Sequence, residues 1–191
     1  MCGARGARVV GMAKPNALAM YVVSCSKHLE SNMLLNEDCL ESLTTRSMQA
    51  LGGIVLYRYF KSRNKLTAEI QVLALHQISV LVEEDLLKWE RSGAALSING
   101  RGDPNPEYFA IIDMQLEKVP SKIIDASTEI GLCALYTDDH AESLLFLGSL
   151  LKWTCFEEIP MEDEILEALP RGRGWGAKIS KEKYKNIIVK L

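Results

Sequence analysis

Two short segments of the sequence combine cationic with aromatic side chains, and these residue types together bind nucleic acid. The segments span residues 57–65 and 171–185. Lys and Arg neutralise backbone phosphates, whereas an exposed aromatic ring stacks on an unpaired base. In the second segment, glycines separate the arginines and let the backbone approach a polyanion closely. The residues predicted to bind RNA or DNA are Arg58, Lys61, Arg63, Lys65, Arg171, Arg173, Trp175, Lys178, Lys181, Lys183 and Lys185.

Both segments also have simpler interpretations, which the sequence leaves open. Cations after a helix complement the negative end of its dipole, and the aromatic residues of 57–65 also suit a helix core. The cations of 171–185 equally suit a protein partner, an acidic face of the same molecule or solubility. The glycines of 171–185 give that segment less reason to pack as regular structure, so it is the better candidate of the two.

An acidic run lies directly before the second basic segment. Residues 157–167 include Glu157, Glu158, Glu162, Asp163, Glu164 and Glu167. This run suits a contact with the basic segment of the same chain, a docking surface for another subunit or protein, or a solvated helix face. Opposed patches on one chain are a route to head-to-tail assembly, which is closed or open depending on the rotation between copies. The sequence therefore predicts a homo-oligomer or a protein partner that binds through residues 157–167.

Other groups that could do chemistry give weak signals. The sequence has neither a GxxxxGK[ST] phosphate loop nor an HExxH zinc motif. Residues 138–142 offer Asp, His and Glu side chains as metal ligands, but capping of a helix explains the same residues. A nucleophile pair of Cys133 with His140 has no local support. We therefore predict no catalytic residue, no metal site and no cofactor.

Length and composition limit the class of protein. The chain has 191 residues, 48% hydrophobic and 25% charged, which fits one domain with a sizeable core and excludes a wholly disordered or disulfide-dense chain. The net charge of −3 is the sum over three segments, of which the middle one is acidic and the outer two are basic. Residues 1–65 hold nine Lys/Arg against four Asp/Glu, residues 66–169 six against twenty, and residues 170–191 seven against one. Both ends are therefore basic, and the net charge does not exclude a polyanionic partner.

Helical signals dominate the first half of the chain. Apolar residues at helical spacing predict a helix from a cap at Asn36 to about residue 65. Gly52-Gly53 interrupts it and predicts a kink, a close helix crossing or a break. A second helix is predicted over about 67–92, from a cap at Thr67 to Gly93. His76 lies within it and is interpreted as a buried core histidine.

The second half is less uniform. Helices are predicted over about 139–156, capped at Asp139, over a short acidic stretch at 161–169, and after a cap at Ser180. Two apolar stretches, 130–136 and 187–189, suit either a helix or a strand.

These signals predict a mainly α fold, namely a single helical domain with room for minor β-strands and a basic, semi-flexible C-terminal segment. The helical domain spans 1–170 and includes a long loop at 97–107, where two glycines and two prolines occur. The basic segment spans 171–191.

Location is inferred from the N-terminus and the cysteines. The apolar run at 17–23 is at the lower limit of length for a signal peptide, and no segment approaches the length that spans a membrane. The five cysteines form no CxxC pair and are interpreted as reduced thiols. We therefore expect a cytoplasmic protein, or one in the cytoplasm or nucleus of a host cell if it is viral, with no membrane partner.

The functional hypothesis is a non-enzymatic binding protein, such as a small viral, phage or regulatory factor. It acts by self-association and by contact with nucleic acid or nucleoprotein. The alternative is a helical protein–protein adaptor or inhibitor without nucleic-acid binding, and the third is an enzyme with a dispersed active site.

Overall fold

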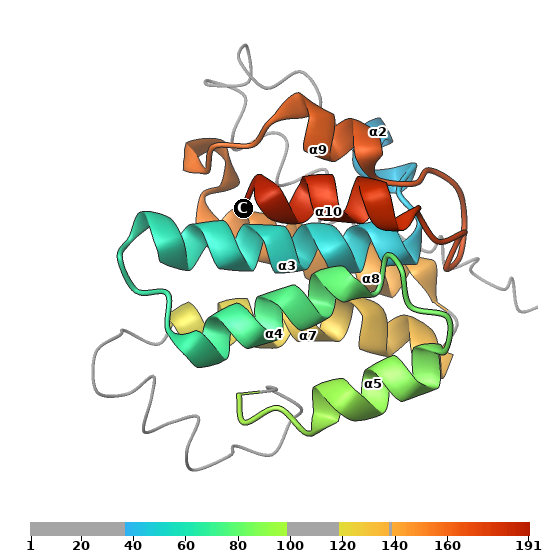
Figure 1. The fold of residues 1–191 in the computed structure, drawn as a ribbon, viewed down its shortest axis with the longest axis horizontal. Helices are drawn as coiled ribbons and strands as arrows, with labels where there is room; N and C mark the ends of the chain where they lie inside the picture. Colours follow the sequence, from blue (N-terminus) through green and yellow to red (C-terminus); the bar gives the residue numbers. More distant parts are fainter. Residues whose placement is uncertain (1–36, 99–118, 138) are drawn as a thin grey trace, which may run out of the picture.

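The computed structural model describes residues 37–98, 119–137 and 139–191, which form a single helical domain (Figure 1). Within these residues one isolated β-bridge joins Leu43 to Arg171. The mainly α prediction is confirmed. The elements are α2 (Glu37–Glu41), α3 (Thr45–Ser62), α4 (Ala68–Ser79), α5 (Leu86–Ala94), α7 (Val119–Thr137), α8 (His140–Thr154), the 3₁₀ turn η1 (Phe156–Glu158), α9 (Asp163–Ala168) and α10 (Lys181–Val189).

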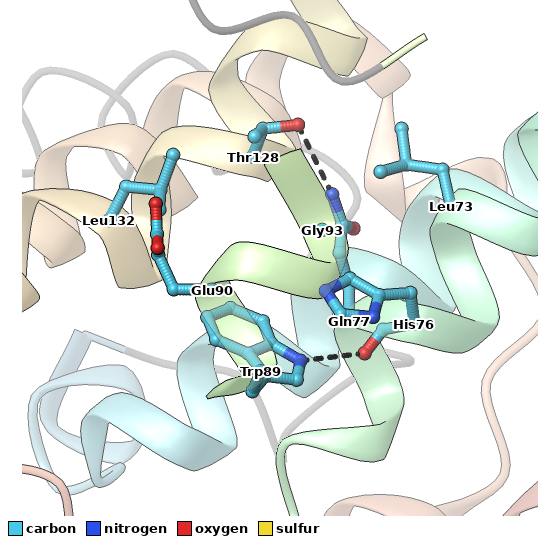
Figure 2. Close-up of a pocket in the computed structure, with 8 residues that line it drawn as sticks. All are labelled: Leu73, His76, Gln77, Trp89, Glu90, Gly93, Thr128 and Leu132. Atoms are coloured by element: carbon cyan, nitrogen blue, oxygen red, sulfur yellow. Dashed lines mark hydrogen bonds between the residues drawn. The ribbon is translucent and has the colours of Figure 1, made fainter. Parts of the chain in front are cut away.

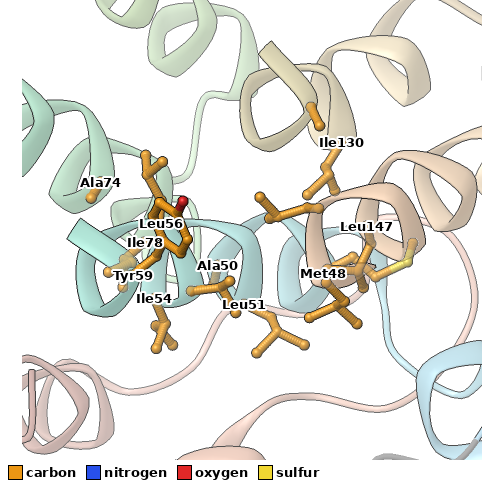
Figure 3. Packing of buried hydrophobic residues seen from close by; sticks show 14 of the residues in the cluster. Met48, Ala50, Leu51, Ile54, Leu56, Tyr59, Ala74, Ile78, Ile130 and Leu147 are labelled. Carbon is orange, nitrogen blue, oxygen red and sulfur yellow. The ribbon is translucent and has the colours of Figure 1, made fainter. Parts of the chain in front are cut away.

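Helix α3 lies at the centre of the domain. It packs against α4, α7 and α8, and Figure 1 shows α10 running alongside it in the same direction. Fifteen of its 18 residues are buried, so α3 is covered on all sides, as a central helix must be. Figure 3 shows apolar side chains such as Met48, Leu51 and Ile54 around it, together with Ile130 and Leu147 from α7 and α8.

The Gly52-Gly53 pair is the site of a close helix crossing. Helix α3 continues through both residues without a break. A Cβ atom on Gly53 would lie 2.8 Å from the backbone oxygen of Ala74 in α4, and one on Gly52 would lie 2.6 Å from Cδ1 of Ile130 in α7. The absence of side chains therefore lets α4 and α7 approach α3 on two sides.

Two predicted helices prove to be interrupted. The first is broken at 42–44, where Thr44 caps α3 by accepting from the backbone N–H of Ser47. The second is divided by a turn over 80–85. Arg46 explains that turn, since its guanidinium donates to the backbone oxygens of Val80 and Glu83. These carbonyls lie at and beyond the end of α4, where a helix leaves its last carbonyls without an internal partner.

The predicted caps in the rest of the chain are confirmed. Thr67, Asp139 and Ser180 cap α4, α8 and α10 through their side-chain oxygens. Both ambiguous stretches, 130–136 and 187–189, are helical. The predicted cap at Asn36 and most of the predicted loop at 97–107 lie outside the described residues. Among residues 37–98, 119–137 and 139–191, no helix has the length and apolar character needed to cross a bilayer.

Candidate functional site

Arg58 lies on α3 and is only 7% exposed. Its guanidinium forms an ion pair with Glu162 and donates to the backbone oxygens of Pro160 and Lys190, to the latter at 2.7 Å. Arg58 therefore ties the segment before α9 and the end of α10 to the central helix. A phosphate would reach this guanidinium only after these contacts had opened, so the geometry gives Arg58 an internal structural role.

The other cations of residues 57–65 lie at the exposed end of α3. Lys61 Nζ donates to the backbone oxygen of Leu191 at 2.6 Å. The guanidinium of Arg63 lies 3.9 Å from the centre of the Tyr59 ring, and Lys65 is exposed. Arg58 and Lys61 thus join residues 57–65 to the negative C-terminal end of α10, a few residues beyond the second basic segment.

The first residues of the C-terminal segment contact the start of α3. Arg171 donates to Ser42 Oγ at 2.9 Å, and the backbone N–H of Thr45 donates to the oxygen of Gly174 at 2.8 Å. Trp175 is half-buried, and its ring lies edge-on to Trp89, with centroids 6.5 Å apart. Part of the Trp175 ring is therefore occupied by packing instead of being free to stack on a base. Arg173, in contrast, is exposed.

Four lysines lie in or just before α10. Lys178, before the helix, pairs with Glu84. Lys181, Lys183 and Lys185 are exposed, and Lys183 faces α9. Lys181 and Lys185 are four residues apart and so share one face of α10, whereas Lys183 lies on the side of the groove with α9.

The acidic middle of the sequence partly neutralises its basic ends. Among the described residues, three ion pairs join acidic residues of 66–169 to cations of 1–65 or 170–191: Arg58–Glu162, Lys178–Glu84 and Lys190–Glu164. The latter two are substantially exposed, and such pairs contribute little to stability because water screens them. Their main consequence is that they reduce the positive charge that the C-terminal segment presents to a polyanion.

A groove of about 460 Å³ lies between α9 and α10. Its apolar side chains are Ile165 and Ala168 from α9 and Ile187 and Val189 from α10. Val189 is 86% exposed. This groove falls on the part of the acidic run that the sequence singles out as a docking surface.

The two walls of the groove carry opposite charges. Glu164 and Glu167 line the α9 side, whereas Lys183 and Lys190 line the α10 side. Glu164 and Lys190 pair with each other across it. Glu167 and Lys183 are both exposed and have no ion-pair partner among the described residues, so they are available to a second molecule.

A second, much smaller pocket lies between α4, α5 and α7 (Figure 2). The His76 ring lines this pocket and stacks on Trp89, with centroids 5.1 Å apart and an interplanar angle of 7°. Trp89 Nε1 also donates to the backbone oxygen of His76 at 2.9 Å. A Cβ on Gly93 would lie 2.5 Å from His76 Nε2, so only glycine lets the ring lie against α5. His76 is thus half-buried and docks one helix on another.

The packing of His76 predicts a loss of stability in mild acid. Burial lowers the pKa of His76 below its ordinary value, against a smaller opposing effect of Glu83. Below about pH 6.5 the unfolded chain takes up a proton that the folded protein resists. The free energy of unfolding should therefore fall as pH drops from about 6.5 to the folded pKa. Urea unfolding between pH 7.5 and 5 measures this fall, and His76→Phe, which keeps a stacked ring, should flatten it. If the unfolding free energy of the variant fell equally with pH, the effect could not be assigned to His76.

The structure gives little support to a nucleophilic site. Burial raises the pKa of the Cys133 thiol, which opposes formation of the reactive thiolate. Cys133 Sγ lies 3.3 Å from Ser143 Oγ, whereas His140 Nδ1 lies 3.4 Å from Thr45 Oγ1. Within the part of the chain that the structure describes, no three His, Cys, Asp or Glu side chains gather as metal ligands.

Sequence reasoning missed the buried polar residues. Gln49 on α3 donates to the backbone oxygen of Ser127 at 2.7 Å and accepts from the N–H of Gly131 at 2.6 Å. Gln77 on α4 bonds the same stretch of α7 through its side chain. The available signal was their placement among apolar neighbours at helical spacing, where a polar residue must find partners.

Comparison with protein-family models, with curated proteins and with solved structures gives no match to this chain.

Proposed function

We propose that this protein is a non-enzymatic binding protein that self-associates through the groove between α9 and α10. The observation that carries the proposal is the arrangement of charge: an acidic wall and a basic wall face each other across an apolar floor. A two-fold axis parallel to the groove brings each acidic wall over the basic wall of the other copy. Glu167 of one copy then faces Lys183 of the other, twice per dimer, as an isologous interface requires.

Val189 supplies the apolar part of this contact. It is the most exposed of the large hydrophobic side chains within the described residues, and it lies on the groove. Burying an exposed valine at an interface contributes about 1.5 kcal/mol or more. Charge complementarity fixes the register of the two copies, and the apolar floor supplies affinity.

Sedimentation equilibrium over a concentration series tests self-association. The wild-type protein should show a weight-average mass that rises towards twice that of one chain. Val189→Glu should remove the rise, because it places a charge in the apolar floor. The matched control is Val72→Glu on α4, where the valine is 51% exposed and lies outside the groove; this variant should still associate. A wild-type mass that stays at one chain throughout would refute the proposal. An amphipathic helical peptide that bound the groove of a monomer would instead favour the adaptor.

Nucleic-acid binding is a second candidate, supported by cations that remain exposed. Arg173, Lys181, Lys185 and Lys65 are exposed and form no ion pair among the described residues, although the charge of Lys181 also acts on Glu84. These cations could neutralise phosphates without opening any internal contact. Arg58 and Lys178, which the sequence also suggests, are engaged in ion pairs.

The salt dependence of binding tests this second candidate. Each phosphate contact that is lost should reduce the slope of log affinity against log salt by about 0.7 for single strands and about 0.9 for duplex DNA. Lys181→Gln with Lys185→Gln should therefore shrink the slope for RNA or DNA by about 1.4–1.8. Lys88→Gln with Lys152→Gln removes the same charge from α5 and α8 and should leave the slope unchanged. Absence of binding by the wild type at low salt would remove the candidate.

A further inference from the structure

The side-chain amide of Gln77 has an orientation that its hydrogen bonds determine. Nε2 lies 3.1 Å from Ser127 Oγ and 3.3 Å from Thr128 Oγ1. Both hydroxyl groups already donate to the backbone oxygen of Ile124, at 2.8 Å and 2.9 Å. Each hydroxyl has a single proton to donate, so towards Gln77 both can only accept. The NH₂ group of Gln77 must therefore face α7.

The other end of the same amide lacks a partner. Gln77 is 2% exposed, and its Oε1 atom has no hydrogen-bond partner among the described residues. A buried acceptor without a donor costs about 1–3 kcal/mol. Exchanging the positions of nitrogen and oxygen would not remove the problem, because the NH₂ group would then occupy the position that has no partner. The Oε1 atom therefore requires a donor from elsewhere.

The small pocket beside Gln77 has room for such a donor. About 20 Å³ of it is open to the centre of a water molecule, and a single water needs about 10–15 Å³ by this measure. Sites for organic ligands measure about 300–1,000 Å³, so this pocket excludes them. Leu73, Leu132 and Trp89 form apolar walls, while His76 and Glu90 add polar groups to the lining (Figure 2).

We propose that the pocket between α4, α5 and α7 is a binding site for one internal water molecule, which donates a hydrogen bond to Gln77 Oε1. Buried waters usually make about three hydrogen bonds. The polar groups of His76 and Glu90, which come from α4 and α5, are the further candidates in the lining. The water thus completes the polar contact of α4 with α7. It lies in the pocket that α5 also lines, through Trp89 and Gly93.

Water itself is the probe in the experiment that tests this site. A high-resolution crystal structure of the full chain should show a density peak about 2.7–3.2 Å from Gln77 Oε1. In solution, water should give cross-relaxation peaks to the Nε2 protons of Gln77. Oxygen-17 relaxation dispersion should count one fewer long-lived water in Gln77→Met, a variant that keeps a straight side chain and removes the acceptor.

Gln49→Met is the matched control, because Gln49 is equally buried but both polar atoms of its amide have a partner, Nε2 at Ser127 and Oε1 at Gly131. This variant should leave the count of long-lived waters unchanged. The site is refuted if the wild-type map shows no peak beside Oε1, or a protein donor bonded to it. It is also refuted if Gln77→Met folds and keeps the same count. If either variant fails to fold, the wild-type map alone decides.

Discussion

Gly53→Ala is expected to lower the free energy of unfolding by about 2 kcal/mol, although alanine is the better helix former by about 1 kcal/mol. The added Cβ would lie 2.8 Å from the backbone oxygen of Ala74, 2.9 Å from Cγ1 of Ile78 and 3.0 Å from Cβ of Gln77. None of these atoms is the free end of a flexible side chain, so α4 itself must move away from α3. Chemical denaturation of both proteins measures the change.

The neighbouring glycine provides the control. A Cβ on Gly52 would contact Cδ1 of Ile130 at 2.6 Å, the far end of a side chain that can change rotamer. The gain in helix propensity then offsets much of the strain, and Gly52→Ala should stay within about 1 kcal/mol of the wild type. If Gly53→Ala were as stable as Gly52→Ala, the helix crossing would not be as close as described.

Arg58→Met should be the second strongly destabilising change, with a loss of about 2–4 kcal/mol. The variant removes three contacts at once, to Glu162, to the backbone oxygen of Pro160 and to that of Lys190. The side chain of Glu162 is 46% exposed, so its charge stays hydrated after the substitution. Methionine keeps the apolar volume of the side chain, so the loss reflects the hydrogen bonds.

Hydrogen exchange distinguishes this role of Arg58 from a general loss of stability. Relative to the wild type, Arg58→Met should increase the exchange rates of α10 amides more than those of α7 amides. The reason is that the end of α10 loses its contact with α3. Arg63→Met is the control: Arg63 is exposed and lies over the Tyr59 ring, a contact that contributes about 0.5–1 kcal/mol. A similar small loss in both variants would contradict the internal role of Arg58.

The helices could be predicted where local chemistry determines them. Thr67, Asp139 and Ser180 satisfy backbone donors within their own first turn, so their caps can be recognised from sequence. The turn over 80–85 could not be recognised, because Arg46, distant in sequence, binds the carbonyls of Val80 and Glu83. Such a long-range contact outweighs helical periodicity. The one local signal is Asp85, whose side chain accepts from the backbone N–H of Lys88 and caps α5.

The candidate site was only partly predictable for the same reason. The acidic run at 157–167 could be singled out from its charge, and the structure places Glu164 and Glu167 on a groove. Whether each cation is buried or exposed depends on tertiary packing. Arg58 and Lys65 belong to one basic segment, yet the fold buries the first and exposes the second. The unpartnered oxygen of Gln77 likewise depends on hydroxyl groups about 50 residues away, at Ser127 and Thr128.

Charge exchange across the groove tests the central claim, self-association, most directly. Glu167→Lys places two lysine pairs in the two-fold interface, and Lys183→Glu places two glutamate pairs there, so sedimentation should show each variant as a monomer. An equimolar mixture restores both attractive pairs and should dimerise, as should the double variant Glu167→Lys/Lys183→Glu. A mixture that stays monomeric while the wild type dimerises would contradict this interface, and a wild type that is monomeric at every concentration would contradict self-association itself.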